Sequence, residues 1–195
     1  MALAKTYMTP EEYLKFERAS QEKHEYFAGE IFAMTGASKN HNRISGSTYA
    51  ALYAQLRDRP CDIFPSDMRV KPRSNILYTY PDISIVCGTP EFADSEFDIL
   101  LNPTVIIEVL SPSTEAFDRG KKFQHYRTMP SLQEYILIAQ DSIRIEHYGL
   151  VDNQWVLTDA KTLETVINLP SINCTLSLSD VYEKVNFDDQ EGLNP

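Results

Sequence analysis

The sequence predicts a single α/β domain with a central mixed β-sheet flanked by helices, to which an N-terminal helix and hairpin and a C-terminal hairpin are attached. Three observations predict this fold class. The 195 residues are 43% hydrophobic and 24% charged, which is an ordinary globular composition for one domain. Strand-like and helix-like apolar patterns alternate along the chain. Residues 104–110 also carry a nearly uninterrupted apolar run, which is typical of a central strand covered on both faces.

The N-terminal third predicts a helix, a β-hairpin and a second helix. Thr9-Pro10-Glu11-Glu12 is a capping box with proline in the first turn, so a helix begins there. Ala28-Gly29 separates two short apolar segments and indicates a hairpin. Asn40 can cap the second helix, whose apolar residues recur at helical spacing. We expect helices over residues 9–19 and 41–57 and hairpin strands over residues 24–27 and 30–34.

The remainder of the chain predicts strands and one further helix. Ser111-Pro112-Ser113-Thr114 forms a turn and helix start, and Pro130 ends the helix that follows over about residues 115–128. Alternating apolar residues then indicate a C-terminal hairpin. We expect strands over residues 61–71 with a break at Pro65, 80–87, 104–110, 134–139, 143–148, 155–158 and, at a sheet edge, 165–169.

Nothing in the sequence divides the chain into separate units, because it has no internal repeat, low-complexity tract or linker. We therefore expect one domain over residues 1–195. Its core would cover about 23–140, a β extension about 141–185 and an acidic tail 186–195.

The cysteines and the apolar runs give expectations about the protein's environment. Cys61, Cys87 and Cys174 are odd in number and widely spaced, so we expect reduced, buried thiols. The longest apolar runs are about five residues, far below the roughly 18–20 that span a bilayer. No secretory signal pattern is present at the N-terminus, and we expect a cytoplasmic protein without membrane contact.

The charge is acidic overall but unevenly distributed. A formal net charge of −10 argues against a protein that coats nucleic acid through net charge alone. Bases outnumber acids over residues 39–73, and residues 119–127 contain four bases and no acid. These two segments could form a local basic face, or they could simply be solvated.

Two acidic residues occupy strands that otherwise favour burial. Asp82 precedes Ile83-Ser84-Ile85-Val86, and Glu108 interrupts the apolar run of residues 104–110. An unpaired buried carboxylate costs several kcal/mol, so something must compensate for each. A divalent cation shared between neighbouring strands is one solution, since Mg²⁺ takes one or two carboxylates with waters and phosphate. A position at a strand end that reaches solvent, or an internal ion pair, is the alternative.

The helix expected after Glu108 offers a basic partner. On a helical wheel, Lys122 falls beside the apolar stripe formed by Tyr126 and Met129, whereas Lys121 points roughly the opposite way. Lys122 could therefore extend its ammonium over the core edge towards the two carboxylates. An exposed Asp118–Lys122 pair at i,i+4 is the alternative.

The spacing and identity of these acidic residues resemble those of a known group of proteins. Pro81-Asp82 followed by Glu108-Val109-Leu110 resembles the PD-(D/E)xK nuclease superfamily with its restriction-endonuclease-like core. Over residues 8–185 the chain resembles, more narrowly, the Uma-type family of proposed endonucleases that is common in cyanobacteria. The residues that carry this resemblance are His24-Glu25, Gly29-Glu30, residues 38–41, Tyr80-Pro81-Asp82, residues 108–114, Asp118-Arg119-Gly120, Lys122, Tyr126 and Glu134-Tyr135.

The resemblance implies an endonuclease that hydrolyses DNA phosphodiester bonds with Mg²⁺, for which Mn²⁺ would substitute. It implies that Asp82, Glu108 and the Val109 backbone carbonyl bind the metal. The superfamily's lysine two residues after the glutamate is replaced by Leu110, and Lys122 matches a position from which related families supply that lysine. Its role would be to orient the attacking water.

Further residues match recurring family positions or lie in the two basic segments. His41 could approach the phosphate or the attacking water, or be a hydrogen-bonded residue at the core edge. Glu25 could be an accessory ligand, or simply a hairpin or salt-bridge residue. The candidates for contact with the DNA backbone are Lys39, Arg43, Arg69, Lys71 and Arg119.

Weak, salt-sensitive DNA binding and a homodimer, as in many relatives, would follow from this interpretation. Two rivals remain open: a catalytically silent binding or assembly protein that keeps the fold, which Leu110 and the acidic charge favour, and a hydrolase of a smaller phosphate ester.

Overall fold

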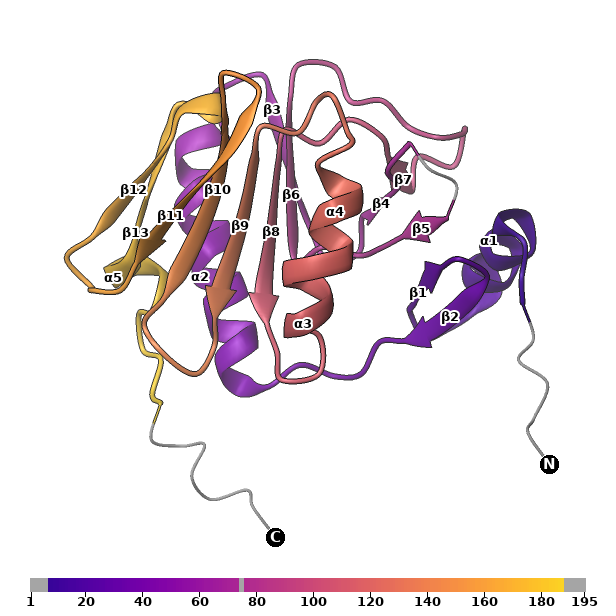
Figure 1. Cartoon of the computed structure of the whole chain (residues 1–195), viewed down its shortest axis with the longest axis horizontal. Coiled ribbons are helices and arrows are strands. Elements are labelled where there is room, and N and C mark those ends of the chain that lie inside the picture. Colours follow the sequence, from indigo (N-terminus) through magenta and orange to yellow (C-terminus); the bar gives the residue numbers. More distant parts are fainter. Residues whose placement is uncertain (1–6, 74–75, 188–195) are drawn as a thin grey trace, which may run out of the picture.

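The central sheet organises the chain, of which the computed structural model describes residues 7–73 and 76–187. The sheet has six strands in the order β11-β10-β9-β8-β6-β3 (Figure 1). β8 and β9 are parallel and the other neighbours are antiparallel, which confirms the predicted mixed sheet. The strands are β3 (Cys61–Pro65), β6 (Ile83–Cys87), β8 (Val105–Leu110), β9 (Glu134–Ala139), β10 (Ile145–Val151) and β11 (Gln154–Ala160).

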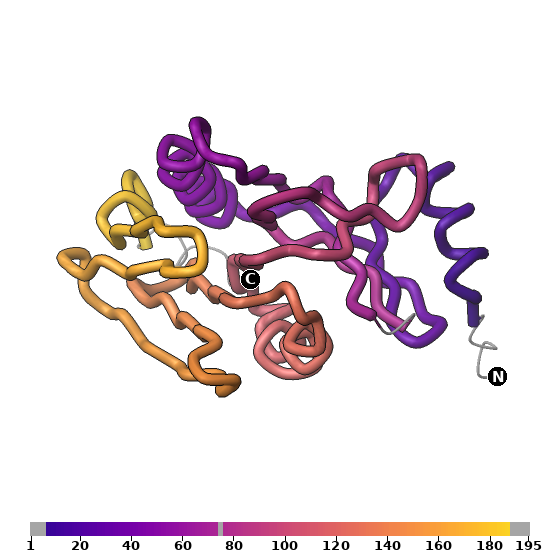
Figure 2. The backbone as a smooth tube through the Cα atoms, turned by 90° about the horizontal axis from the view of Figure 1, so that it is seen from above, coloured from indigo at the N-terminus to yellow at the C-terminus, as the bar shows by residue number. Residues whose placement is uncertain are grey.

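Helices cover both faces of the sheet, as Figure 2 shows from above. Because side chains alternate along a strand, Val105, Ile107 and Val109 of β8 face α2 (Lys39–Leu56). Ile106 and Leu110 face the opposite layer, which contains Phe123 and Tyr126 of α4 (Phe123–Tyr126). β8 is buried along its whole length, as the apolar run predicted.

The predicted helix over residues 115–128 is interrupted. It consists of α3 (Glu115–Phe117), a π-helical turn η1 (Asp118–Lys122) and α4. The hydroxyl of Tyr135 donates to the backbone carbonyl of Asp118 at 3.0 Å, which gives this carbonyl a partner outside the helix. A π-turn of this kind often marks a functional site.

The N-terminal elements form a separate small sheet beside the central one. α1 (Pro10–Ala19) begins with the predicted capping box at Thr9. β1 (His24–Phe27) and β2 (Glu30–Ala33) form the predicted hairpin, and β1 also pairs with β5 (Leu77–Tyr78). The remaining short elements are β4 (Arg69–Val70), β7 (Ile99–Leu100), β12 (Val166–Leu169), η2 (Pro170–Ile172), β13 (Cys174–Ser177) and α5 (Leu178–Val181).

The prediction that Asn40 caps the second helix is wrong. Ser38 is the N-cap, and its hydroxyl accepts a hydrogen bond from the His41 N–H at 3.1 Å. Asn40 lies two residues too late for this role and is buried, where its side-chain amide donates to the Asn186 carbonyl at 2.9 Å. Residues 188–195, the greater part of the predicted acidic tail, lie outside the described residues.

The expectation of three reduced thiols is also wrong. Cys61 and Cys87 form a disulfide, and Cys174 is the buried free thiol. Cys61 in the edge strand β3 lies directly opposite Cys87 in β6, so strand pairing brings together two residues that are 26 positions apart in sequence. In the described part of the chain, no helix is long and apolar enough to span a membrane.

We expect reduction of this disulfide to lower the free energy of unfolding by about 2–4 kcal/mol, because the bridge restricts the unfolded chain. Urea unfolding with and without reductant measures the change. Thiol titration of the denatured, unreduced protein should detect one thiol, and three after reduction. Three thiols before reduction would contradict the pairing.

Candidate active site

Asp82 and Glu108 lie on one face of the central sheet. Ile83 of β6 pairs with Ile107 of β8, and continuing this antiparallel register places Asp82 opposite Glu108. Directly opposite residues project from the same face of a sheet. Glu108 is buried, and Asp82 lies just before β6, where its Oδ2 accepts a hydrogen bond from the Val109 N–H at 2.7 Å. The structure therefore brings the two predicted acids together.

Lys122 reaches these acids from the π-turn. Its Nζ lies 3.1 Å from Glu108 Oε1, 3.0 Å from Glu25 Oε1 and 3.1 Å from Asp118 Oδ1. Lys122 is only 4% exposed. Lys121 instead lies on the surface, with its Nζ 5.3 Å from the centre of the Phe27 ring. The Asp118–Lys122 pair also forms, but it is buried among the acids rather than exposed on a helix face.

His41 approaches the same acids from the first turn of α2. Its Nε2 lies 3.3 Å from Asp82 Oδ2, and it also forms a hydrogen bond with the Val109 backbone. Burial alone would lower the pKa of His41, but the hydrogen bond to Asp82 and the charge of this carboxylate outweigh burial and raise the pKa above its ordinary value. His41 therefore belongs to the site through its contact with Asp82.

The cluster carries an excess of negative charge. Three carboxylates, those of Glu108, Glu25 and Asp118, lie within 3.1 Å of the buried Lys122 ammonium, and Asp82 adds its negative charge next to Glu108. Burial raises the pKa of Glu108 well above its usual range, Lys122 opposes this increase, and Asp118 and Asp82 add to it. Burial would lower the pKa of Lys122, but Glu108 and Glu25 outweigh it and raise that pKa. The site thus favours additional positive charge.

Each of the two sheet acids keeps one carboxylate oxygen without a partner among the described residues. Glu108 uses only Oε1, for Lys122 and for the hydroxyl of Tyr126 at 3.2 Å. Asp82 uses only Oδ2, for the Val109 N–H and His41. Oε2 of Glu108 and Oδ1 of Asp82 therefore remain for another ligand.

This donor set fits a hard divalent cation. Two carboxylate oxygens and a backbone carbonyl are ligands that Mg²⁺ accepts together with waters and phosphate. Within residues 7–73 and 76–187, no group of three or more His, Cys, Asp or Glu side chains is arranged to hold a metal ion.

Several supporting residues were not among the predicted site residues. Asp118 had a signal, since it precedes Lys122 by four residues, but its burial depends on the π-turn. The N–H of Tyr80 donates to Glu25 Oε1 at 3.2 Å, and the Tyr80 hydroxyl donates to Glu17 of α1 at 2.7 Å. This chain of contacts links the N-terminal helix to the lysine, and only the folded structure brings its members together.

The candidates for DNA contact differ in their availability. Arg69 is 5% exposed and paired with Asp98, so the expectation that it contacts the DNA backbone is wrong for this structure. Arg119 is partly buried and pairs with Glu115 and Glu146. Lys39 and Arg43 are exposed at the start of α2, and Lys71 is half-buried with its Nζ 5.5 Å from the Tyr78 ring centre.

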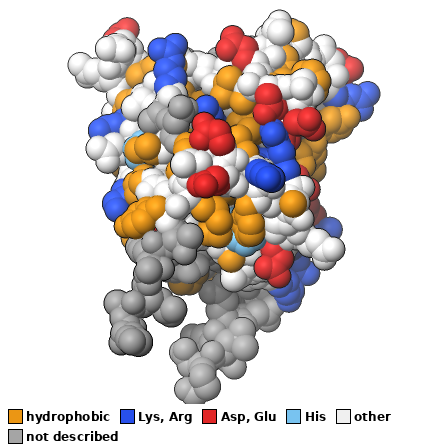
Figure 3. All heavy atoms as spheres, turned by 90° about the vertical axis from the view of Figure 1, so that its right-hand side faces the viewer, with side chains coloured by type: hydrophobic (Ala, Val, Ile, Leu, Met, Phe, Trp, Pro, Cys, Tyr) orange, Lys and Arg blue, Asp and Glu red, His pale blue; other side chains and the backbone are white. Residues whose placement is uncertain are grey.

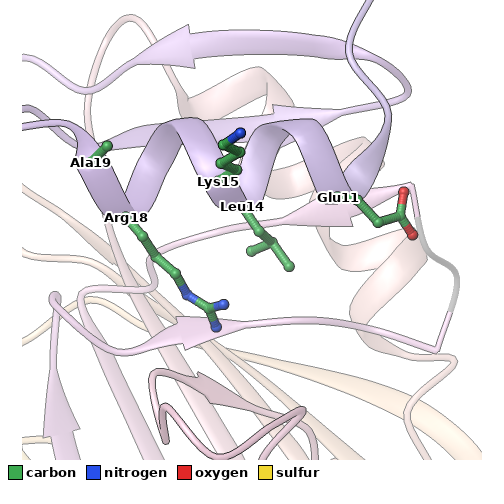
Figure 4. A pocket seen from close by; sticks show the side chains of 5 residues that line it. All are labelled: Glu11, Leu14, Lys15, Arg18 and Ala19. Atoms are coloured by element: carbon green, nitrogen blue, oxygen red, sulfur yellow. The ribbon is translucent and has the colours of Figure 1, made fainter.

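Two other hollows lie away from this cluster. A depression of about 540 Å³ runs along α1, where Figure 4 shows Leu14 and Arg18 projecting from the helix, and its Arg18 is paired with Asp94 and Asp98. A second, of about 360 Å³, lies beside the Glu134–His147 pair. Neither is lined by the acids described above, and it is the buried acids in contact with Lys122 that make their cluster the candidate active site.

Comparisons with known proteins give one family match and two relatives. The family model "Uma2: Putative restriction endonuclease" matches residues 10–179. Two relatives from Synechocystis sp. (strain ATCC 27184 / PCC 6803 / Kazusa) are "Uncharacterized protein sll1609", 44% identical over 78% of this chain and 86% of its own length, and "Uncharacterized protein slr1290", 36% identical over 92% and 94%.

A solved structure described as a "putative nuclease belonging to DUF820", from Anabaena variabilis ATCC 29413, aligns with a TM-score of 0.74. The alignment covers 92% of this chain and 99% of that one at 20% identity, so it supports the fold alone.

Proposed function

The chain belongs to the Uma2 family, whose model is described as "Putative restriction endonuclease", and we propose that it is a metal-dependent endonuclease that hydrolyses DNA phosphodiester bonds. The observation that carries this proposal is the pair of unused oxygens on Asp82 and Glu108, which share one face beside a buried lysine. An assembly protein has no need for two further acids, Glu25 and Asp118, around that lysine.

Asp82, Glu108 and the Val109 carbonyl would hold Mg²⁺, for which Mn²⁺ would substitute. Such an ion polarises a phosphoryl oxygen and makes hydroxide available near neutral pH. Lys122 orients the attacking water and offsets charge that develops on the phosphate. Glu25 and Asp118 hold the lysine in place, while His41 holds the Asp82 carboxylate.

The partner in this proposal is DNA, and the active form is a homodimer. Lys39, Arg43 and Lys71 would contact the phosphate backbone. With so few basic side chains near the site of an acidic protein, affinity is weak and falls steeply with salt.

The substitution Asp82→Asn tests the proposal. We expect it to abolish Mn²⁺- or Mg²⁺-dependent cleavage of DNA, offered as a plasmid, as short duplexes and as single strands, because it removes one metal ligand, while circular dichroism shows an unchanged fold. Asp67→Asn, at an exposed aspartate of the loop between β3 and β4, is the matched control and should retain cleavage. Absence of cleavage by both the wild type and Asp82→Asn would favour the silent assembly protein, and equal cleavage by both would show that Asp82 is not a metal ligand. Cleavage of mononucleotide esters but of no DNA would favour the small-ester hydrolase.

A further inference from the structure

Phe32 is an exposed aromatic residue beside the acidic cluster. It is 49% exposed and lies on β2 directly opposite Glu25 of β1. Directly opposite residues of an antiparallel pair share a face, with Cβ atoms about 4.5–5.5 Å apart. Because the Glu25 carboxylate lies 3.0 Å from Lys122 Nζ, Phe32 stands at the rim of the site.

Phe27 lies on the same face of the hairpin as Phe32, but the two rings differ in their packing. Phe27 packs edge-on against Phe117 and His125, with ring centres 5.8 Å and 5.6 Å away. Phe32 has no such ring partner in the described part of the chain. From β2 the chain continues to the start of α2, where His41 contacts Asp82 (Figure 1). Phe32 is therefore an exposed ring next to Glu25, on the strand that leads to the helix carrying His41.

The distribution of charge near the site favours binding of single-stranded DNA over binding of double-stranded DNA. Duplex DNA carries one negative charge per about 1.7 Å of its axis, and tight binding needs many phosphate contacts. Here Arg69 is buried and Arg119 is already paired with two acids, while the chain has a net charge of −10. Figure 3 shows that on the N-terminal side of the molecule the basic side chains are separate and lie between acidic and apolar ones, without a continuous basic stripe. Binding of DNA must therefore also depend on contacts with groups other than the phosphates.

We propose that Phe32 is a stacking platform for a base of single-stranded or locally unpaired DNA, which is the substrate class that the site takes. A single strand exposes the faces of its bases, and stacking on an aromatic side chain holds them with little dependence on sequence. The phosphate of the same nucleotide would then lie by Lys122 and the sheet acids. This inference rests on the proposed endonuclease function and adds the kind of DNA on which it acts.

Binding of short oligonucleotides that contain 2-aminopurine tests the proposal, with Ca²⁺ in place of Mg²⁺ to limit cleavage. The wild type should bind the single strand more tightly than the duplex of equal length and quench the 2-aminopurine fluorescence. Phe32→Ala should weaken single-strand binding about 5- to 100-fold and lose the quenching, and Phe32→Trp should retain both.

Tyr53→Ala is the matched control and should change the affinity by less than about twofold. Tyr53 is also 49% exposed, but it stacks on Tyr49 and lies twelve residues, or about 18 Å, along α2 from His41. Tighter binding of the duplex, or equal affinities of Phe32→Ala and Tyr53→Ala, would overturn the role of Phe32. If cleavage still required Asp82 in that case, the endonuclease proposal would survive. Neither binding nor cleavage of any DNA would overturn both.

Discussion

Replacing Lys122 with methionine is expected to abolish cleavage and to lower the free energy of unfolding by about 3–5 kcal/mol. Methionine fills a similar volume but leaves the carboxylates of Glu108, Glu25 and Asp118 buried without their shared ammonium. The loss of one partner of a buried ion pair is costly because the remaining charge is neither solvated nor paired. Urea unfolding followed through the single tryptophan, Trp155, in the presence of EDTA measures the effect.

Lys121→Met provides the control, since it makes the same chemical change at the next residue. Lys121 is exposed over the Phe27 ring, so its replacement should change stability by no more than about 0.5 kcal/mol. Added Mg²⁺ should restore part of the stability that Lys122→Met loses, because positive charge returns to the acids. Equal unfolding curves for the two variants would show that the ammonium does not hold the cluster together.

Glu108→Gln is expected to lose metal binding and cleavage but to keep its stability, unlike Lys122→Met. Metal ions contribute several kcal/mol to transition-state stabilisation, and each 1.36 kcal/mol is tenfold, so the rate should fall about 100-fold or more. Cleavage assays and calorimetric titration with Mn²⁺ check this. Glu134→Gln is the control: Glu134 is an equally buried acid on the adjacent strand that pairs with His147, and its replacement should leave Mn²⁺ binding intact.

The stability of the Glu108→Gln variant follows from the raised pKa of Glu108. A carboxyl whose pKa is raised by folding stabilises the native state at low pH and loses that contribution as the pH rises above the ordinary glutamate range. In EDTA at pH 7, the neutral glutamine should therefore be as stable as the wild type or more stable. A large loss of stability would mean that the charged carboxylate is needed for folding rather than for metal binding.

The long elements of the fold were predictable because their patterns are local. The capping box at Thr9 fixes the start of α1, and the apolar run fixes the buried strand β8. Strands of two residues, such as β5 and β7, are too short for any periodicity and exist only because the folded chain places partners beside them. The Cys61–Cys87 disulfide was missed for the same reason, since it depends on the register of two strands.

The site residues that could be predicted are charged residues in segments whose apolar pattern favours burial. Glu108 stands out as a charge in an apolar strand, and the helical wheel selected Lys122 over Lys121. The wheel assumed a continuous α-helix, whereas the structure has a π-turn that turns Asp118 and Lys122 inward together. Arg69 shows the limit of charge counting, because a basic residue in a basic segment is buried against Asp98. Whether a basic side chain is exposed depends on the folded structure and not on the charges of its neighbours in sequence.

A crystal structure of the protein soaked with Mn²⁺ tests the central claim most directly, because the anomalous signal locates the ion. The account predicts one Mn²⁺ bound by the free oxygens of Asp82 and Glu108 and by the Val109 carbonyl, with the Lys122 ammonium still in contact with Glu108. No ion at these oxygens, or an ion bound instead beside the Glu134–His147 pair, would contradict it.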